Sequence, residues 1–281
     1  MGPVIGVLHP GEMGAAIAAA LTGAGAEVRW CSAGRSPATR RRAEAEGLVE
    51  VPDLAGLVAG TDVVVSVCPP GSAGAVAEAV LAAGFGGLYV DANAIAPTTA
   101  RDLAHDVAAA GASFVDGGIV GPPPRGEGVT WLHLSGERAP EVAALFANGP
   151  VTTVVHDGGA GVASAVKACF AAWTKGSAAL LVAVRATAVA HGVDAALLDQ
   201  WGAVDPGLVG RSERAAASLS MKGWRWDAEM LEIAETFAAA GLPAGFHEAA
   251  AEVCARLAGF RDRPVPLDEV VAELLGERPA D

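Results

Sequence analysis

The chain has 281 residues, of which 52% are hydrophobic and 18% charged, so it is long enough for two folded domains and too apolar for a disordered protein. Its formal net charge of -13 repels phosphate backbones, and we therefore expect no nucleic-acid partner. The four cysteines are far apart and form no C-x-x-C pair. This predicts neither a metal site nor a disulfide framework and favours a reducing, cytoplasmic location.

No signal peptide is expected, because the start of the chain lacks a basic region followed by a long apolar run. Charged side chains interrupt the one long apolar stretch, residues 162–191, so no membrane span is expected either.

Up to residue 157 the chain alternates short β-rich apolar runs with alanine-rich runs of helical composition. Apolar strands that alternate with helices predict a mostly parallel sheet covered by helices on both faces. The expected strands are Val4–Leu8, Val28–Cys31, Val63–Cys68, Leu88–Asp91, Ser113–Asp116, Val129–Leu134 and Val151–His156. The expected helices are Met13–Thr22, Pro37–Ala45, Ser72–Ala82, Thr98–Ala110 and Pro140–Ala147.

After residue 157 no convincing strand follows, and residues 158–281 are predicted to form an all-helical domain built on a long interdomain helix. That helix is apolar on nearly all sides and must therefore be buried on all sides. Because its own domain is too small to surround it, we expect a homodimer formed through this domain. The expected helices are Ala160–His191, Ala195–Trp201, Arg211–Leu219, Asp227–Ala240, Phe246–Leu257 and Leu267–Leu275.

The loop between the first strand and the first helix carries a glycine pattern typical of dinucleotide sites. Gly11 lets the backbone approach a pyrophosphate, Gly14 permits close packing of helix on strand, and His9 stands where the pattern has its first glycine. We therefore predict an N-terminal Rossmann domain over residues 1–157. The alternative is that the loop is a tight turn that binds no ligand. For His9 the alternative to a cofactor contact is an ordinary histidine in a turn. The expected cofactor contacts here are Leu8, His9, Pro10, Gly11, Glu12, Met13 and Gly14.

The end of the second strand predicts which dinucleotide binds. An NAD site usually has Asp or Glu at this point to hold the ribose hydroxyls. This chain has Ser32, Arg35 and Ser36 there, with Arg40 one turn into the next helix. An arginine fork and hydroxyl groups suit the 2′-phosphate of NADP, so we predict NADP(H) as the cofactor. The next two arginines, Arg41 and Arg42, are interpreted as part of a solvent-exposed helix face.

Two further segments end strands on the side where ligands of open α/β sheets lie. Cys68 ends the third expected strand and Pro69 follows it, while Asn93 follows the fourth. All three are expected to contact the cofactor, with Asn93 on the nicotinamide ribose; an ordinary turn asparagine is the alternative.

With these motifs in place, the chain resembles the β-hydroxyacid dehydrogenase and 6-phosphogluconate dehydrogenase superfamily, of which imine reductases are relatives. The resemblance covers nearly the full length. It rests on the cofactor loop, on Asp116–Pro122, which looks like the substrate segment, and on Gly161–Lys167, which looks like the start of the helix with the catalytic lysine. The stretch Arg225–Ala234 resembles a poorly characterised branch with its own helical C-terminal domain.

The chain departs from that family at two positions. Gly121 stands where family dehydrogenases usually have a serine, and Ala171 stands where they have an asparagine. On a regular helix Ser164 and Thr174 face the same way as Lys167, so either is a candidate to replace the missing hydrogen bond. These departures leave the substrate open.

Hydride transfer to a carbonyl requires a proton donor, and the reverse reaction requires a base. Lys167 lies in an otherwise apolar stretch and is the predicted acid and base, with a lysine at the domain edge as the alternative. Lys175 is a secondary candidate for binding an acidic substrate group. The other predicted substrate contacts are Gly118, Val120, Gly121, Thr174, Trp226 and Met230, with core packing equally open for the last two.

The sequence thus predicts an NADP-dependent dehydrogenase or reductase that acts on a small hydroxy acid or carbonyl compound. Imine reductases generally have another residue in place of the catalytic lysine. The presence of Lys167 therefore favours carbonyl reduction over imine reduction, which is the second candidate. A different class of function is also open, a protein that binds NADP as a sensor and catalyses no reaction.

Overall fold

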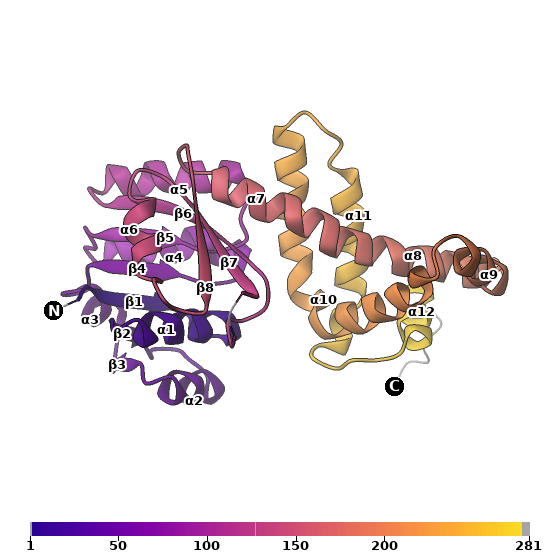
Figure 1. Ribbon diagram of the computed structural model, residues 1–281, viewed down its shortest axis with the longest axis horizontal. Helices are drawn as coiled ribbons and strands as arrows, with labels where there is room; N and C mark the ends of the chain where they lie inside the picture. Colours follow the sequence, from indigo (N-terminus) through magenta and orange to yellow (C-terminus); the bar gives the residue numbers. More distant parts are fainter. Residues whose placement is uncertain (1, 127, 277–281) are drawn as a thin grey trace. The chain divides into compact units, whose positions relative to one another are not determined.

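The computed structural model describes residues 2–126 and 128–276 of the chain (Figure 1). Contacts divide it into two units, Met1–Ala168 and Cys169–Asp281, which are described separately below. The division falls later than the boundary expected at residue 157, because the start of helix α7 (Val162–Ala171) is hydrogen-bonded to a strand of the N-terminal sheet.

The N-terminal unit holds an eight-stranded sheet in the order β3-β2-β1-β4-β5-β6-β7-β8. The first six strands are parallel, while β7 pairs antiparallel with β6 and β8 pairs parallel with β7. The predicted Rossmann fold is confirmed, with its change of strand order between β1 and β4. The strands are β1 (Val4–Leu8), β2 (Glu27–Cys31), β3 (Val49–Val51), β4 (Val63–Ser66), β5 (Leu88–Asp91), β6 (Ser113–Val120), β7 (Thr130–Ser135) and β8 (Val151–His156).

Two hydrophobic cores cover the two faces of this sheet, because successive side chains of a strand point to opposite faces. On β1, Ile5 and Val7 belong to one core, with residues of α1 and α6, while Leu8 belongs to the other, with residues of α3, α4 and α5. The helices are α1 (Glu12–Gly23), α2 (Pro37–Ala45), α3 (Leu54–Val58), α4 (Ala73–Ala82), α5 (Pro97–Ala109) and α6 (Ala139–Ala144).

The sequence analysis missed β3 and α3. Strand β3 has three residues, of which Val49 and Glu50 are exposed, so it carries no apolar run to detect. Helix α3 has five residues and begins at Asp53, whose side chain accepts a hydrogen bond from the Gly56 N–H at 2.7 Å. The N-cap residue Asp53 was the one feature of the sequence from which this helix could have been predicted.

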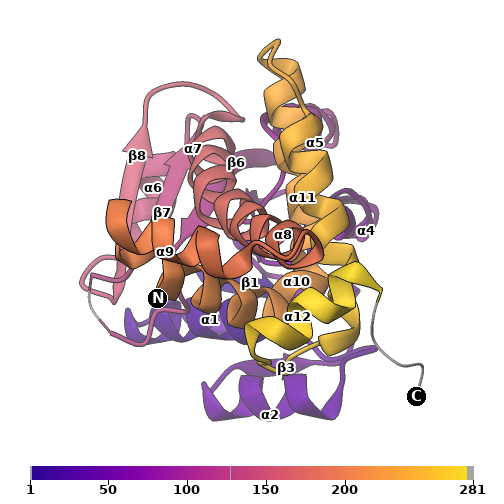
Figure 2. The same cartoon turned by 90° about the vertical axis from the view of Figure 1, so that its right-hand side faces the viewer.

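The C-terminal unit is helical, as predicted. After α7 the same helix continues through a π-helical turn, Ala172–Gly176, into α8 (Ser177–Ala190). The remaining helices are α9 (Asp194–Val204), α10 (Gly207–Ala239), α11 (Gly245–Arg256) and α12 (Leu267–Leu275), of which α10 and α11 run side by side (Figure 2).

Helix α10 corrects the expectation of two helices, Arg211–Leu219 and Asp227–Ala240, because it runs unbroken for 33 residues. The intervening segment contains Gly223, which lowers helix propensity. A Cβ at Gly223 would lie 3.2 Å from the Cys254 carbonyl oxygen, so this glycine lets α11 approach closely. Tertiary packing therefore outweighs the local propensity.

Within residues 2–126 and 128–276, no helix combines the length and apolar character needed to cross a membrane.

A buried arginine joins three helices of the C-terminal unit. Arg185 of α8 donates two hydrogen bonds to the Asp194 carboxylate, at 2.7 and 2.9 Å, and a third to the Ser212 hydroxyl at 3.0 Å. Only 7% of Arg185 is exposed.

We expect Arg185→Ala to lower the free energy of unfolding by about 3 kcal/mol, because it leaves the half-buried Asp194 carboxylate without its partner. Urea denaturation measures this. Arg211→Ala, which breaks the exposed pair with Asp205, is the matched control and should cost about 0.5 kcal/mol or less. Equal losses in the two variants would contradict the assignment.

Candidate functional site

The β1–α1 loop has the backbone geometry of a nucleotide cradle. A Cβ at Gly14 would lie 2.4 Å from the His9 carbonyl oxygen, so this glycine is required for close packing of α1 on the loop. A Cβ at Gly11 would meet only that same oxygen, at 3.9 Å, and otherwise open space. The loop therefore offers an accessible backbone at the start of a helix, which suits a pyrophosphate.

His9 replaces the first glycine of the pattern without changing the backbone, because it adopts the left-handed conformation with φ at 61°. Its imidazole is partly buried, and Nδ1 is buried without a hydrogen-bond partner among the described residues. Burial, followed by the charge of Arg35, lowers the pKa of His9 from 6.5 to about 4, so the ring is neutral at pH 7.

At the end of β2, three of the four side chains predicted to hold a 2′-phosphate already have partners. Ser36 is the N-cap of α2 and accepts a hydrogen bond from the Thr39 N–H at 3.2 Å. Arg40 pairs with Glu50 at 2.6 Å. A hydrogen bond from Ser32, together with Arg40 beside it, lowers the pKa of the Glu50 carboxyl.

Arg35 differs from these three, because its Nε is buried without a partner. It therefore has a buried donor that no described protein group uses and that a phosphate could accept. Glu50 was missed by the sequence analysis because it lies on β3, the strand that the analysis also missed.

The ends of β4 and β5 are joined by Asn93. Its amide donates to Asp91 at 2.7 Å and to the Ser66 hydroxyl at 3.1 Å, and its oxygen accepts from the Cys68 N–H at 2.5 Å. Asn93 is only 3% exposed, so the structure gives it the task of shaping the loop that contains Cys68 and Pro69. Its predicted contact with the nicotinamide ribose stays a prediction, as do the contacts of Cys68 and Pro69.

Burial raises the pKa of the Cys68 thiol to about 11. The thiol at the end of β4 therefore stays protonated at neutral pH and contributes no charge to the cradle.

The start of α7 is fixed by the buried carboxylate of Asp116 on β6. It accepts hydrogen bonds from the N–H groups of Gly161 and Ser164, at 2.8 and 3.0 Å, and from the hydroxyls of Ser164 and Ser135, at 2.5 and 3.1 Å. A helix start leaves N–H groups without partners, and a carboxylate there also interacts favourably with the helix dipole. The sequence analysis placed Asp116 in the family's substrate segment but missed this role.

Lys167 lies in the second turn of that helix, where the helix packs against β6. A Cβ at Gly118 would lie 2.9 Å from the Lys167 Cβ and 2.7 Å from the Ala163 carbonyl oxygen. Glycine at position 118 is therefore required for α7 to pack on the strand. Gly118, predicted as a substrate contact, has this clear packing role, and the catalytic role of Lys167 stays a prediction.

The backbone at position 121 requires glycine. Gly121 has φ at 115°, and a Cβ there would lie 2.2 Å from the Val129 carbonyl oxygen. No serine fits this conformation. The neighbouring Val120 is 6% exposed, which makes it a core residue of the β6 end.

Neither hydroxyl proposed to replace the missing asparagine is free. Ser164 donates to Asp116, and Thr174 donates to the Phe170 carbonyl oxygen at 3.0 Å. The expected alignment of Thr174 with Lys167 assumed a regular α-helix, whereas Thr174 lies in the π-helical turn, which changes the direction of the side chains after it.

In the C-terminal unit, Lys175 forms a largely buried ion pair with Glu229 and lies 5.2 Å from the centre of the Trp226 ring. Glu229 offsets the positive charge of Lys175, which was expected to bind an acidic group of the substrate. Met230 is fully buried, so core packing, which the sequence left open for it, is the interpretation that the structure favours.

Two histidines that the sequence analysis left unassigned meet on the sheet. His133 Nδ1 and His156 Nε2 are 2.9 Å apart on neighbouring strands, and His133 is the cross-strand partner of Gly118. Burial, followed by His156, lowers the pKa of His133. No group of three or more metal-ligating side chains occurs among the described residues.

Comparison with known families shows what the N-terminal unit is similar to. Residues 4–139 match the NAD binding domain of 6-phosphogluconate dehydrogenase, so most of the N-terminal unit has the sequence pattern of this domain. Residues 188–257 match a domain of unknown function, DUF1932, so the resemblance to a branch with its own C-terminal domain is confirmed. No curated protein matches the chain.

Solved structures share the fold over the full length. A conserved hypothetical protein from Sinorhizobium meliloti 1021 is 29% identical, with a TM-score of 0.67 over 99% of this chain and 97% of that one. The 3-hydroxyisobutyrate dehydrogenase of Mycobacterium tuberculosis, solved with L-serine, is 21% identical, with a TM-score of 0.71 over 98% and 99%. An imine reductase from Streptomyces aurantiacus is 22% identical, with a TM-score of 0.53 over 97% and 99%.

The geometry of Gly121 leads to a prediction. Gly121→Ser, which restores the family's residue, should lower the free energy of unfolding by about 2 kcal/mol, because the new Cβ meets the Val129 carbonyl oxygen. Thermal or urea unfolding measures the loss. Gly126→Ser is the control, since a Cβ at that glycine meets nothing within 4 Å. A Gly121→Ser protein as stable as wild type would show that the loop is not constrained in this way.

Proposed function

We propose that the chain is an NADP(H)-dependent oxidoreductase that acts on a small hydroxy acid or carbonyl compound, with Lys167 as the general acid and base. The observation that carries this is the placement of Lys167, which lies above Gly118 on a helix whose start is fixed by Asp116, in the same unit as the nucleotide cradle. The bound nicotinamide would supply or accept the hydride.

The residues of the chain fit a dinucleotide. Gly11 opens the loop to the pyrophosphate, and the helix start of α1 supplies N–H groups for it. Arg35 has a buried nitrogen without a partner and would bind the 2′-phosphate of NADP. In carbonyl reduction the Lys167 ammonium donates a proton to the carbonyl oxygen; in alcohol oxidation the neutral amine accepts the hydroxyl proton.

Imine reduction is the second candidate. Gly121 and Ala171 leave the chain without the family's serine and asparagine, and imine reductases share its fold. An iminium already carries a positive charge, so a cationic lysine beside it is unfavourable. Lys167 therefore favours the carbonyl reaction.

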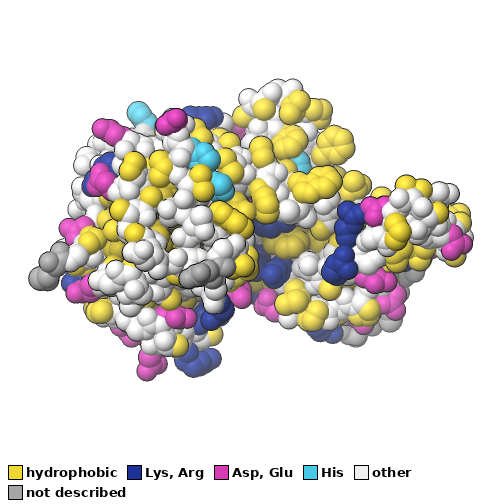
Figure 3. All heavy atoms as spheres, in the orientation of Figure 1, with side chains coloured by type: hydrophobic (Ala, Val, Ile, Leu, Met, Phe, Trp, Pro, Cys, Tyr) yellow, Lys and Arg dark blue, Asp and Glu magenta, His cyan; other side chains and the backbone are white. Residues whose placement is uncertain are grey.

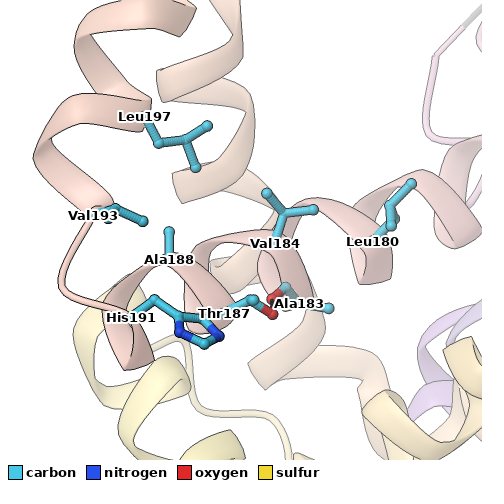
Figure 4. A pocket seen from close by; sticks show the side chains of 8 residues that line it. All are labelled: Leu180, Ala183, Val184, Thr187, Ala188, His191, Val193 and Leu197. Carbon is cyan, nitrogen blue, oxygen red and sulfur yellow. Dashed lines mark hydrogen bonds between the residues drawn. The ribbon is translucent and has the colours of Figure 1, made fainter.

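We also propose that two chains associate through the C-terminal unit in a reducing, cytoplasmic setting, which suits four free cysteines. Large apolar side chains are exposed on this unit, among them Trp173 at 74% and Leu180 at 61% (Figure 3). Beside Leu180, helices α8 and α9 form an apolar groove of about 460 Å³ that Val184 and Leu197 also line (Figure 4). A single copy in light scattering at micromolar concentration would contradict this arrangement.

Lys167→Met is expected to lower kcat for carbonyl reduction by about a hundredfold or more, because the proton donor is lost. NADPH consumption at neutral pH, with short aldehyde acids and keto acids beside cyclic imines, measures this. Lys222→Met removes an exposed lysine and serves as the control. Turnover of imines that survives Lys167→Met would assign the chain to imine reduction. NADPH binding without turnover of any substrate would favour a non-catalytic NADP-binding sensor.

Arg35→Ala is expected to weaken NADPH binding by about tenfold to a hundredfold and NADH binding much less, because one charge-assisted phosphate contact is lost. Calorimetric titration with each cofactor measures the difference, with Arg41→Ala, an exposed arginine of α2, as the control. Equal weakening of both cofactors would contradict the phosphate assignment.

A further inference from the structure

Two buried nitrogen atoms near the cradle have no hydrogen-bond partner in the protein. They are Nδ1 of His9 and Nε of Arg35. A buried polar group without a partner costs about 1–3 kcal/mol, so most such groups are satisfied. Two such atoms on loops that follow paired strands indicate that their partner is a ligand.

The two side chains come from loops that meet at one edge of the sheet. His9 follows β1, Arg35 follows β2, and these strands pair in parallel. The charge of Arg35 contributes to the lowered pKa of His9, which places the guanidinium near the imidazole. Ligands of open α/β sheets bind outside the carboxyl ends of the strands, and β1 is next to the change of strand order.

The charges of the surrounding groups define what fits between these nitrogens. His9 is neutral, Cys68 stays a thiol, and Arg40 offsets the charge of Glu50. Of the other acids on the neighbouring elements, Glu12 of α1 and Glu44 of α2 are exposed, Glu27 of β2 pairs with Arg29, and Asp91 at the end of β5 is bonded to Asn93. Among the described residues no carboxylate forms an ion pair with Arg35, so Arg35 and His9 offer one positive charge and two donors to a single anion.

The backbone conformation at position 9 is one that glycine adopts more easily than any residue with a side chain. Glycine adopts φ near 61° without strain, whereas another residue pays about 1–2 kcal/mol for the left-handed conformation. Histidine therefore brings an imidazole to this loop at a conformational cost, which is consistent with a role for the ring itself.

From this arrangement we propose that His9 is a specificity-determining residue, whose imidazole N–H donates to the same phosphomonoester that Arg35 binds, the 2′-phosphate of the cofactor. This rests on the proposed use of NADP. The two residues form a clamp with one charged and one neutral donor. A ribose with a free 2′-hydroxyl fills it poorly, because it brings no charge to offset Arg35.

The test is calorimetric titration of the full chain with two nucleotides, adenosine 2′,5′-bisphosphate and adenosine 5′-monophosphate. Wild type should prefer the 2′-phosphorylated nucleotide. His9→Gly keeps the backbone conformation and removes the ring, so it should reduce this preference about tenfold while leaving the affinity for the monophosphate nearly unchanged. His9→Asn, which tolerates the same conformation and retains a donor, should lose less than His9→Gly.

The outcomes separate this inference from the proposed cofactor. If wild type does not distinguish the two nucleotides, the NADP assignment fails, and the clamp fails with it. If wild type does distinguish them and Arg35→Ala abolishes the preference, while His9→Gly leaves it intact, only the role of His9 is overturned. Equal weakening of both nucleotides by His9→Gly would assign the ring to the 5′-phosphate side and would also overturn the proposal.

Discussion

The buried carboxylate of Asp116 is the interaction on which the candidate active site depends. A carboxylate taken out of water must be compensated by hydrogen bonds, and Asp116 receives four, from Ser135, Gly161 and Ser164. These bonds join β6, the end of β7 and the first turn of α7. Lys167 is in the second turn of that helix, so its position on the sheet follows from a side chain about fifty residues earlier in the chain.

Glycines set the second constraint, because each permits a close approach that a Cβ would block. Gly14 allows α1 to meet the cofactor loop, and Gly118 allows α7 to meet β6. At Gly121 the reason is a positive φ together with the Val129 carbonyl oxygen, which a Cβ would meet. Positions 9 and 121 are opposite in kind: His9 has a positive φ and a side chain, whereas the backbone at Gly121 leaves no room for a side chain.

The sequence was sufficient to predict the positions of the main strands along the chain, the nucleotide loop and the helical second half, because these depend on local periodicity and on glycines at short spacing. It was insufficient wherever a role depends on a distant partner. The engagement of Ser32 by Glu50 and the ion pair of Lys175 with Glu229 bring together residues from separate elements. Helix α10 illustrates the same limit, since packing against α11 makes Gly223 acceptable in the middle of a long helix. The π-helical turn after α7 left no recognisable pattern at all.

The most direct test of the central claim is amide hydrogen exchange, measured in wild type and in Asp116→Asn. The amide group of asparagine replaces one acceptor oxygen with a donor, so the bonds to the start of α7 cannot all form. We predict faster exchange over Gly161–Lys167 in the variant, with unchanged exchange in the β1–α1 loop. Unchanged exchange over Gly161–Lys167 would show that Asp116 does not hold the helix, and would contradict this account of how Lys167 is positioned.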